Sequence, residues 1–247
     1  MTDIAGEIVV ALVNELMTAI GLLKHGLAGL QAIDAANDFY QLPLLLLANG
    51  SERLCKCVLI LKHESEHGAF PSQAILKKWR HDVRSLTDVV QQECYPAEYL
   101  KRQVAVDDQL FLRSDELLQE AIACLSHYGI GGRYYDLDVI CGAQPAGESP
   151  ESAWQSLEMV IVQRDATMKE MLIDPRAGNR LYKVINLRLQ VTLEKYFRAL
   201  CHLFTLGPIS EEGKRFTGAI GEFLFLRDDQ LGTRDYGQLL WRTSDTR

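Results

Sequence analysis

The chain has 247 residues, of which 47% are hydrophobic and 24% are charged. This composition is close to that of ordinary globular proteins, so the chain can form a hydrophobic core without disulfides or a structural metal. Its formal net charge of −7 disfavours nucleic-acid binding by the surface as a whole, although a local basic groove remains compatible with it.

The cysteines and the N-terminus indicate in which cellular compartment the protein is expected. Several of the six cysteines stand among apolar residues, where free thiols behave as small buried hydrophobes. The N-terminus lacks the basic region and small-residue cleavage site of a secretory signal. We therefore expect a cytoplasmic protein. The longest apolar run, Leu42 to Ala48, is far shorter than the roughly 20 residues that cross a bilayer, so no membrane contact is expected.

Apolar residues at spacings of three and four predict helices along most of the chain. The predicted helices cover residues 4–24, 36–66, 72–92, 107–128 and 209–225. Gly50 stands in the middle of the second one. Because glycine in a helix interior costs about 1 kcal/mol against alanine, it indicates a close approach or a kink there.

Residues 181–205 carry two signals. Leu187, Leu189, Val191 and Leu193 alternate with polar residues as in a strand. A second set fits one face of a helix: Ile185, Leu189, Tyr196, Leu200 and Leu203. The segment continues for about 25 residues without Gly or Pro, which is longer than strands usually are, so we predict a helix. A weak strand signal lies near 134–139, and the tail from Asp228 is predicted to be irregular.

Residues 143–152, rich in Pro, Gly and Ser, are the predicted linker. They divide the chain into a helical bundle core over 1–142 and a C-terminal helical part over 153–247. We expect the two parts to pack together as one unit. Ser149 or Ser152 is expected to begin a helix that continues through Met171.

One short motif has the spelling of a zinc-protease signature. His63-Glu64-Ser65-Glu66-His67 places two histidines one helical turn apart, with a glutamate that can activate a metal-bound water. Gly68 follows at once, however, and Phe70 and Gln73 stand where the extended motif has Gly and His. We therefore predict an exposed helix end, no bound zinc and no cofactor, with a zinc hydrolase as the alternative.

A second group of polar residues interrupts apolar sequence. Glu52, Arg53 and Lys56 lie within one turn of an otherwise apolar helix, and buried charges need partners. We expect Arg53 to bind the carboxylate of Asp82 and Glu52 to bind His81, so that the four meet as one polar cluster. The candidate binding residues are Glu52, Arg53, Lys56, His81, Asp82 and Arg133. The favoured interpretation of these charges is an ion-pair network between packed helices, and a ligand or nucleotide site is the functional alternative.

These residues also carry a resemblance. Gly50-x-Glu52-Arg53-Leu54-x-Lys56 on a long helix, then Phe70-Pro71, then a Lys-rich stretch ending His81-Asp82-x-x-x-Leu86, resembles the HEPN-type helical domains of bacterial defence and toxin–antitoxin systems. The resemblance covers about residues 36–140. It implies a bundle of four or five helices, frequent dimerisation and metal-independent RNA cleavage. Cleaving members carry Arg, four to six residues, then His; no His here has that partner, so the resemblance implies a binding member.

Together, these patterns predict an all-α, multi-helix bundle with a HEPN-like core and additional C-terminal helices. The expected function is a helical binding or interaction module in bacterial defence or stress response. Its expected partner is another protein or a second copy. RNA becomes the partner if Lys56, Lys77, Lys78 and Arg80 line a basic groove. The alternatives are a ribonuclease with an atypical site around His81 and, less favoured, the zinc hydrolase using His63, Glu64 and His67.

Overall fold

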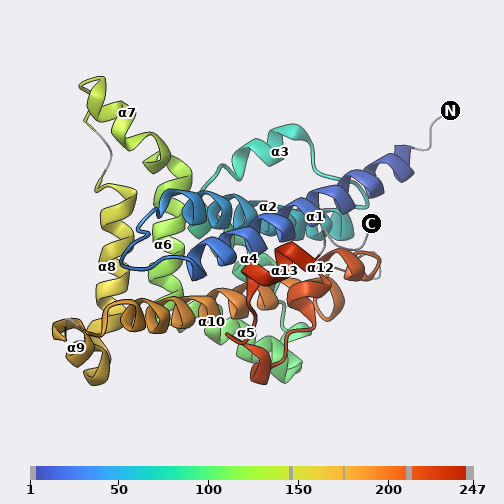
Figure 1. Cartoon of the computed structure of the whole chain (residues 1–247). Coiled ribbons are helices and arrows are strands. Elements are labelled where there is room, and N and C mark those ends of the chain that lie inside the picture. Colours follow the sequence, from blue (N-terminus) through green and yellow to red (C-terminus); the bar gives the residue numbers. More distant parts are fainter. Residues whose placement is uncertain (1–3, 145–146, 175, 210–212, 243–247) are drawn as a thin grey trace.

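The computed structural model describes residues 4–144, 147–174, 176–209 and 213–242, and these residues form helices and loops with no strand among them. The predicted all-α, multi-helix bundle is confirmed. Three long helices cross its centre (Figure 1): α1 (Ile4–Gln31), α2 (Gln41–His67) and α10 (Gly178–Thr205). The shorter ones are α3 (Gln73–Lys78), α4 (Val83–Glu93), η1 (Tyr99–Lys101), α5 (Gln103–Ser114), α6 (Glu116–Ile130), η2 (Gly132–Tyr134), α7 (Tyr135–Ile140), α8 (Pro150–Gln163), α9 (Ala166–Ile173), α12 (Thr217–Leu224), η3 (Asp228–Gln230) and α13 (Tyr236–Arg242).

The first two helices form an antiparallel hairpin whose backbones approach closely at two glycines. A Cβ atom added to Gly26 would lie 2.7 Å from Cγ of Leu47, and one added to Gly50 would lie 2.7 Å from the side chain of Leu23. Both distances are too short for a real contact, so only glycine allows this spacing. The close approach that Gly50 indicated in the sequence is confirmed.

Most of the other helices pack against this hairpin. Helices α4, α6 and α10 pack against α2, while α12 and α13 pack against α1. Helices α8 and α9 lie beside the beginning of α10, at the end of the molecule where α1 connects to α2 (Figure 1). Because α2 is surrounded, its buried residues lie on more than one face: Leu44, Leu47, Leu54, Cys55, Cys57, Val58, Leu59 and Leu61.

Two predicted long helices are each divided in two at an aspartate. Residues 72–92 form α3 and α4, separated by Arg80 at φ 42°, and Asp82 caps α4 by accepting from the amides of Arg84 (3.0 Å) and Ser85 (3.3 Å). Residues 107–128 belong to α5 and α6, and Asp115 caps α6 by accepting from Leu118 N at 2.9 Å. Short polar side chains bind free backbone amides at helix starts, and the periodicity of apolar residues does not reveal such a break.

The helix predicted to run through Met171 begins at Ser149, as expected, with Pro150 as its first residue. It ends at Gln163, because Asp165 accepts from Thr167 N and Met168 N and begins α9. Of the predicted linker, residues 145–146 lie outside the described residues.

Residues 181–205 are helical, as predicted, and lie within α10. Other expectations were wrong. Residues 134–139 belong to η2 and α7 and form no strand, and the tail from Asp228 contains η3 and α13. Of the predicted helix over 209–225, the structure shows α12 over Thr217–Leu224, and residues 210–212 lie outside the described part.

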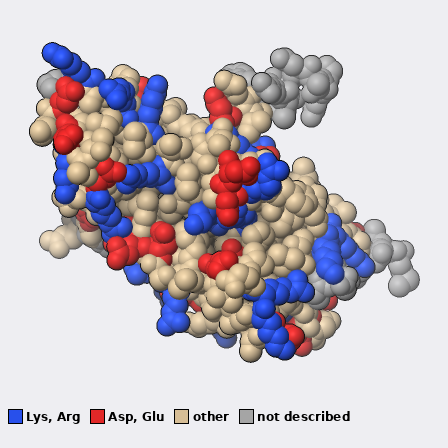
Figure 2. All heavy atoms as spheres, turned by 90° about the horizontal axis from the view of Figure 1, so that it is seen from below, with Lys and Arg blue, Asp and Glu red and all other residues tan. Residues whose placement is uncertain are grey.

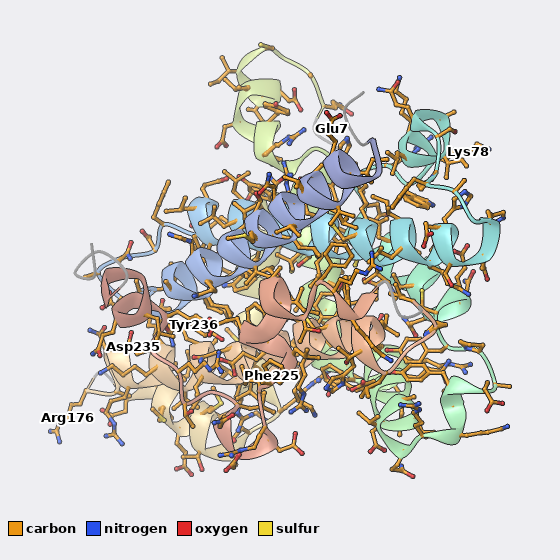
Figure 3. All side chains as sticks on the ribbon, turned by 90° about the vertical axis from the view of Figure 1, so that its right-hand side faces the viewer. Glu7, Lys78, Arg176, Phe225, Asp235 and Tyr236 are labelled. Atoms are coloured by element: carbon orange, nitrogen blue, oxygen red, sulfur yellow. The ribbon has the colours of Figure 1, made fainter. Side chains whose placement is uncertain are left out.

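A fully buried carboxylate attaches this tail to the bundle. Glu194 on α10 accepts from Tyr236 Oη (2.9 Å), Gln190 Nε2 (2.9 Å) and Gly232 N (2.6 Å). Gln31, on α1, accepts from Tyr236 N at 2.9 Å. Tyr236 therefore connects α1 and α10 through its amide and its hydroxyl (Figure 3), and α13 packs against α1.

The segment Gly6–Gln31 of α1 is long and apolar enough to cross a membrane by length and composition, whereas the sequence expectation considered only the run from Leu42 to Ala48. In the bundle this helix packs against α2, α10, α12 and α13, and Leu16, Leu23 and Leu27 are fully buried there. Packing in the core therefore accounts for the apolar character of these three positions. Only 28% of the apolar window is buried, however, and Val10 and Met17 on the same helix are about 60% exposed.

The hairpin predicts opposite effects for two glycine-to-alanine changes. Gly50→Ala should lower the free energy of unfolding by about 1–3 kcal/mol, because the overlap with Leu23 outweighs the gain in helix propensity. Gly21→Ala, in α1 where an added Cβ meets nothing within 4 Å, should raise it by about 0.5–1 kcal/mol. Urea unfolding of both variants measures this. Equal effects on the two sites would contradict the close approach.

Candidate functional site

Three of the six predicted binding residues meet on the surface. His81 Nδ1 lies 2.9 Å from Glu52 Oε1, and the ammonium of Lys56 donates to the same oxygen at 2.7 Å. The predicted contact between Glu52 and His81 is therefore confirmed. The side chain of His81 is 66% exposed, whereas those of Glu52 and Lys56 are 15% and 20% exposed, so the group has the geometry of a structural ion-pair network at the edge of α2.

The other three predicted residues lie elsewhere. Arg53 donates to Glu15 Oε1 on α1 at 2.6 Å, and Asp82 binds the backbone amides at the start of α4, so the expected pair of Arg53 with Asp82 is wrong. Asp82 caps α4 because this helix begins directly after it, so its carboxylate binds the free amides there. Arg133, in η2, places its guanidinium 5.0 Å from the ring centre of Tyr134.

The two histidines of the zinc-like motif end α2. Their rings stack with centroids 4.1 Å apart, and His67 Nδ1 lies 2.9 Å from the backbone oxygen of His63. Gly68 follows in the left-handed conformation with φ 66° and closes the helix. Within the described residues, no group of three His, Cys, Asp or Glu is arranged to hold a metal ion. The absence of bound zinc stays a prediction.

A cavity of about 460 Å³ combines apolar walls with a buried acid. It lies between α8, α9 and the beginning of α10, and Tyr40, just before α2, closes one side. Most of its wall is made of apolar and aromatic side chains, including Met159, Val162, Met171, Leu181, Tyr182 and Ile185. Size and lining are those of a small-molecule site.

Glu158 is the acid in this cavity. It lies on the buried stripe of α8 with Trp154, Leu157 and Ile161, and only 8% of it is exposed. Trp154 Nε1 donates to Oε1 at 3.2 Å, and Tyr40 Oη donates to Oε2 at 3.3 Å. These two donors fix the carboxyl group, and both come from side chains that are themselves buried.

Burial raises the pKa of Glu158 to about 7, although the hydrogen bonds from Tyr40 and Trp154 act in the opposite direction. The carboxyl group therefore holds its proton to a higher pH than an ordinary glutamate does. Burial, followed by the charge of Glu158, also raises the pKa of Tyr40, which keeps its hydroxyl as a proton donor. A strongly shifted acid inside a cavity is typical of functional sites.

The charges around the cavity are negative. Asp174 lines it together with Glu158, and no Lys or Arg is among the described residues of its wall. Asp174 accepts from the backbone amide of Arg176 at 2.9 Å, whereas the side chain of Arg176 projects away from the helices (Figure 3). The cavity therefore favours a ligand with a positive charge.

None of the residues predicted from the sequence as a binding site lies in this cavity. The available signal was one acidic residue on the apolar stripe Trp154, Leu157 and Ile161, since Glu158 falls one turn after Trp154. The stripe itself could be read from the periodicity. The contribution of Tyr40 could not, because it lies 118 positions away in the chain.

A second cavity, of about 420 Å³, lies between α5, α10 and the beginning of η3. His202 Nδ1 lies 2.7 Å from Asp108 Oδ2, and Arg198 donates to Asp228 at 2.7 Å. Cys201, next to His202, is fully buried, and burial raises the pKa of its thiol, as is typical of a structural core cysteine. The lower face of the molecule shows Lys and Arg interspersed with Asp and Glu rather than gathered in one basic patch (Figure 2).

Comparisons with protein-family models, with curated proteins and with solved structures found no match to this chain. The resemblance to HEPN-type domains therefore rests on the residues quoted above alone.

The raised pKa of Glu158 predicts a loss of stability on going from acid to neutral pH. The folded protein holds this proton more tightly than the unfolded chain, so the free energy of unfolding falls as the pH rises from 4.5 to about 7. A shift of this size corresponds to about 3 kcal/mol. Glu158→Gln should remove that fall.

Denaturant unfolding of wild type and Glu158→Gln at several pH values between 4.5 and 8 measures the difference. Other carboxyl groups titrate alike in both proteins and cancel. The same pH dependence in wild type and variant would show that Glu158 has an ordinary pKa.

Proposed function

We propose that this protein is a helical binding module whose ligand is a small apolar molecule carrying a protonated amine, held in the cavity at Glu158. The observation that carries the proposal is a buried carboxyl group in an apolar and aromatic cavity with no Lys or Arg among the described wall residues. A buried charge without a counter-ion is costly, and a ligand ammonium group would supply that counter-ion.

The remaining walls suit the apolar part of such a ligand. Met159 and Met171 offer flexible thioether side chains that adapt to irregular shapes. Tyr40 and Tyr182 offer aromatic faces, which attract cations in addition to the carboxylate. An amine should therefore bind with its charged end at Glu158 and its chain along α9 and α10.

The wider assignment comes from the sequence. An interaction module of bacterial defence or stress response, in the cytoplasm and without membrane contact, stays a prediction. The alternatives of a ribonuclease around His81 and of a zinc hydrolase using His63, Glu64 and His67 stay predictions as well. RNA binding through Lys56, Lys77, Lys78 and Arg80 would accompany the ribonuclease alternative and stays a prediction too.

The proposal predicts that hexylamine binds and that 1-hexanol and hexanoate bind at least tenfold more weakly, because they lack a positive charge. Isothermal titration calorimetry at pH 7 is the measurement. An amine favours the ionised form of Glu158, so binding should release a fraction of a proton at pH 7. Repeating the titration in buffers with different ionisation enthalpies counts that proton.

Two variants make the test specific. Glu158→Gln should weaken hexylamine binding at least tenfold and abolish the proton release. Glu151→Gln, on an exposed position of the same helix, is the matched control and should behave as wild type. No heat of binding with hexylamine, or equal binding by Glu158→Gln, would refute the proposed site.

A further inference from the structure

The second cavity contains an acid and a histidine that are arranged for proton transfer. Asp108 on α5 faces His202 on α10, with His202 Nδ1 2.7 Å from Asp108 Oδ2. Their side chains are only 11% and 14% exposed, so the pair is largely shielded from bulk water. A neutral imidazole has one donor and one acceptor nitrogen, and a carboxylate beside Nδ1 makes that nitrogen the donor. Nε2 of His202 is therefore the acceptor, as a general base requires.

The second ring nitrogen of His202 is accessible to water. His202 lines the cavity, and within the part of the chain that the structure describes its Nε2 makes no hydrogen bond. This nitrogen is also not among the described polar atoms that are both unpartnered and shielded from solvent, so water reaches it. A water molecule that donates to Nε2 can give up that proton when it attacks an electrophile, and the carboxylate of Asp108 then stabilises the imidazolium.

The charges of the cavity wall balance, which determines the kind of molecule that fits. Arg198 donates to Asp228 at 2.7 Å, and Val104 and Phe111 supply apolar wall. The described wall residues include three cations and three acids, namely Lys195, Arg198, Arg227, Asp107, Asp108 and Asp228. Because the wall has no excess of either sign when His202 is neutral, the cavity suits a small uncharged molecule.

Negative charge that develops during a reaction would nevertheless be stabilised here. Lys195 precedes His202 by seven residues, so the two side chains share one face of α10. The ammonium of Lys195 lies 4.6 Å from the ring centre of Phe111 and forms no ion pair with a described acid. Its charge is therefore available to an oxyanion formed in the cavity.

We propose that this cavity hydrolyses small uncharged carboxylic esters, with His202 as the general base that activates water and Asp108 as the residue that positions it. No Ser, Thr or Cys is among the described residues of the wall, so water itself is the nucleophile. The cavity shares no described wall residue with the one at Glu158, and the proposal does not depend on the amine ligand.

The reaction uses one ester and one water. The water oxygen bonds to the carbonyl carbon while Nε2 of His202 takes one of its protons, and the π electrons of the carbonyl move to its oxygen. When the carbonyl forms again, the bond to the alkoxy oxygen breaks and the imidazolium returns the proton to that oxygen. The products are one carboxylic acid and one alcohol, and His202 is neutral again.

Hydrolysis of 4-nitrophenyl acetate by the full-length chain tests the proposal, with the release of 4-nitrophenolate followed by its absorbance. The wild-type rate should saturate with ester concentration. It should be slower in heavy water, because a proton moves as the water attacks. No initial burst of nitrophenolate should occur, because the acyl group is never transferred to the protein.

Three variants assign the residues. His202→Gln should lower kcat by about 100-fold or more. Asp108→Asn should lower kcat by about tenfold or more with little change in KM, because it alters the tautomer and orientation of the imidazole and not the size of the cavity. His25→Gln, at an exposed position of α1, is the control and should keep the wild-type rate. Urea unfolding verifies that each variant is folded.

Two results on the wild type decide independently of any variant. Hydrolysis that does not saturate, or equal rates in ordinary and heavy water, would overturn the proposal. A burst of one nitrophenolate per chain would also overturn it, since a side chain rather than water would then attack the ester. Among the variants, a folded His202→Gln protein with the wild-type rate would exclude His202 as the base.

Discussion

The close packing of α1 against α2 is the constraint on which the remaining structure depends. At Gly26 and Gly50 the side chains of Leu47 and Leu23 on the facing helix occupy the space that a Cβ atom would need, so the two helices pack closely. Helices α4, α6 and α10 cover α2, and α12 and α13 pack against α1. The connection between the two helices then has a fixed place. Asn186 Nδ2 donates to Ile33 O at 2.8 Å, and Ala35 N donates to Asn179 Oδ1 at 3.3 Å, which attaches this connection to α10.

The same connection brings Tyr40 to the cavity. Tyr40 immediately precedes α2, and its hydroxyl reaches Glu158 on α8, so hairpin packing and the geometry of the site are linked through one side chain. The buried acid makes the fold less stable at neutral pH than an apolar residue of the same shape would. A helical bundle could fill this space with leucine. A stability cost concentrated at one group inside a cavity is typical of a site kept for binding.

Sequence reasoning reached the helical class and the position of the long helices because these depend on local periodicity. The helix over 181–205 shows this, since its length without Gly or Pro decided between two patterns. The helix breaks at Asp82, Asp115 and Asp165 were not predicted, because a capping aspartate leaves the spacing of the apolar residues almost unchanged. The partners of charged residues were harder to predict. Glu52 and His81 do meet, but Arg53 found Glu15 on α1, a partner that only the hairpin packing brings near.

The proposed site depends on the ionisation of one side chain. Glu158 is buried against Trp154 and Tyr40, and its pKa should be about 7 in the free protein. Carbon-13 NMR of the carboxyl group, assigned by comparison with Glu158→Gln, measures that pKa directly with and without saturating hexylamine. The account predicts a midpoint near neutrality without the amine and a clearly lower one with it, because the ammonium group favours the ionised acid. A midpoint in the ordinary range of glutamate in the free protein, or one that the amine leaves in place, would contradict it.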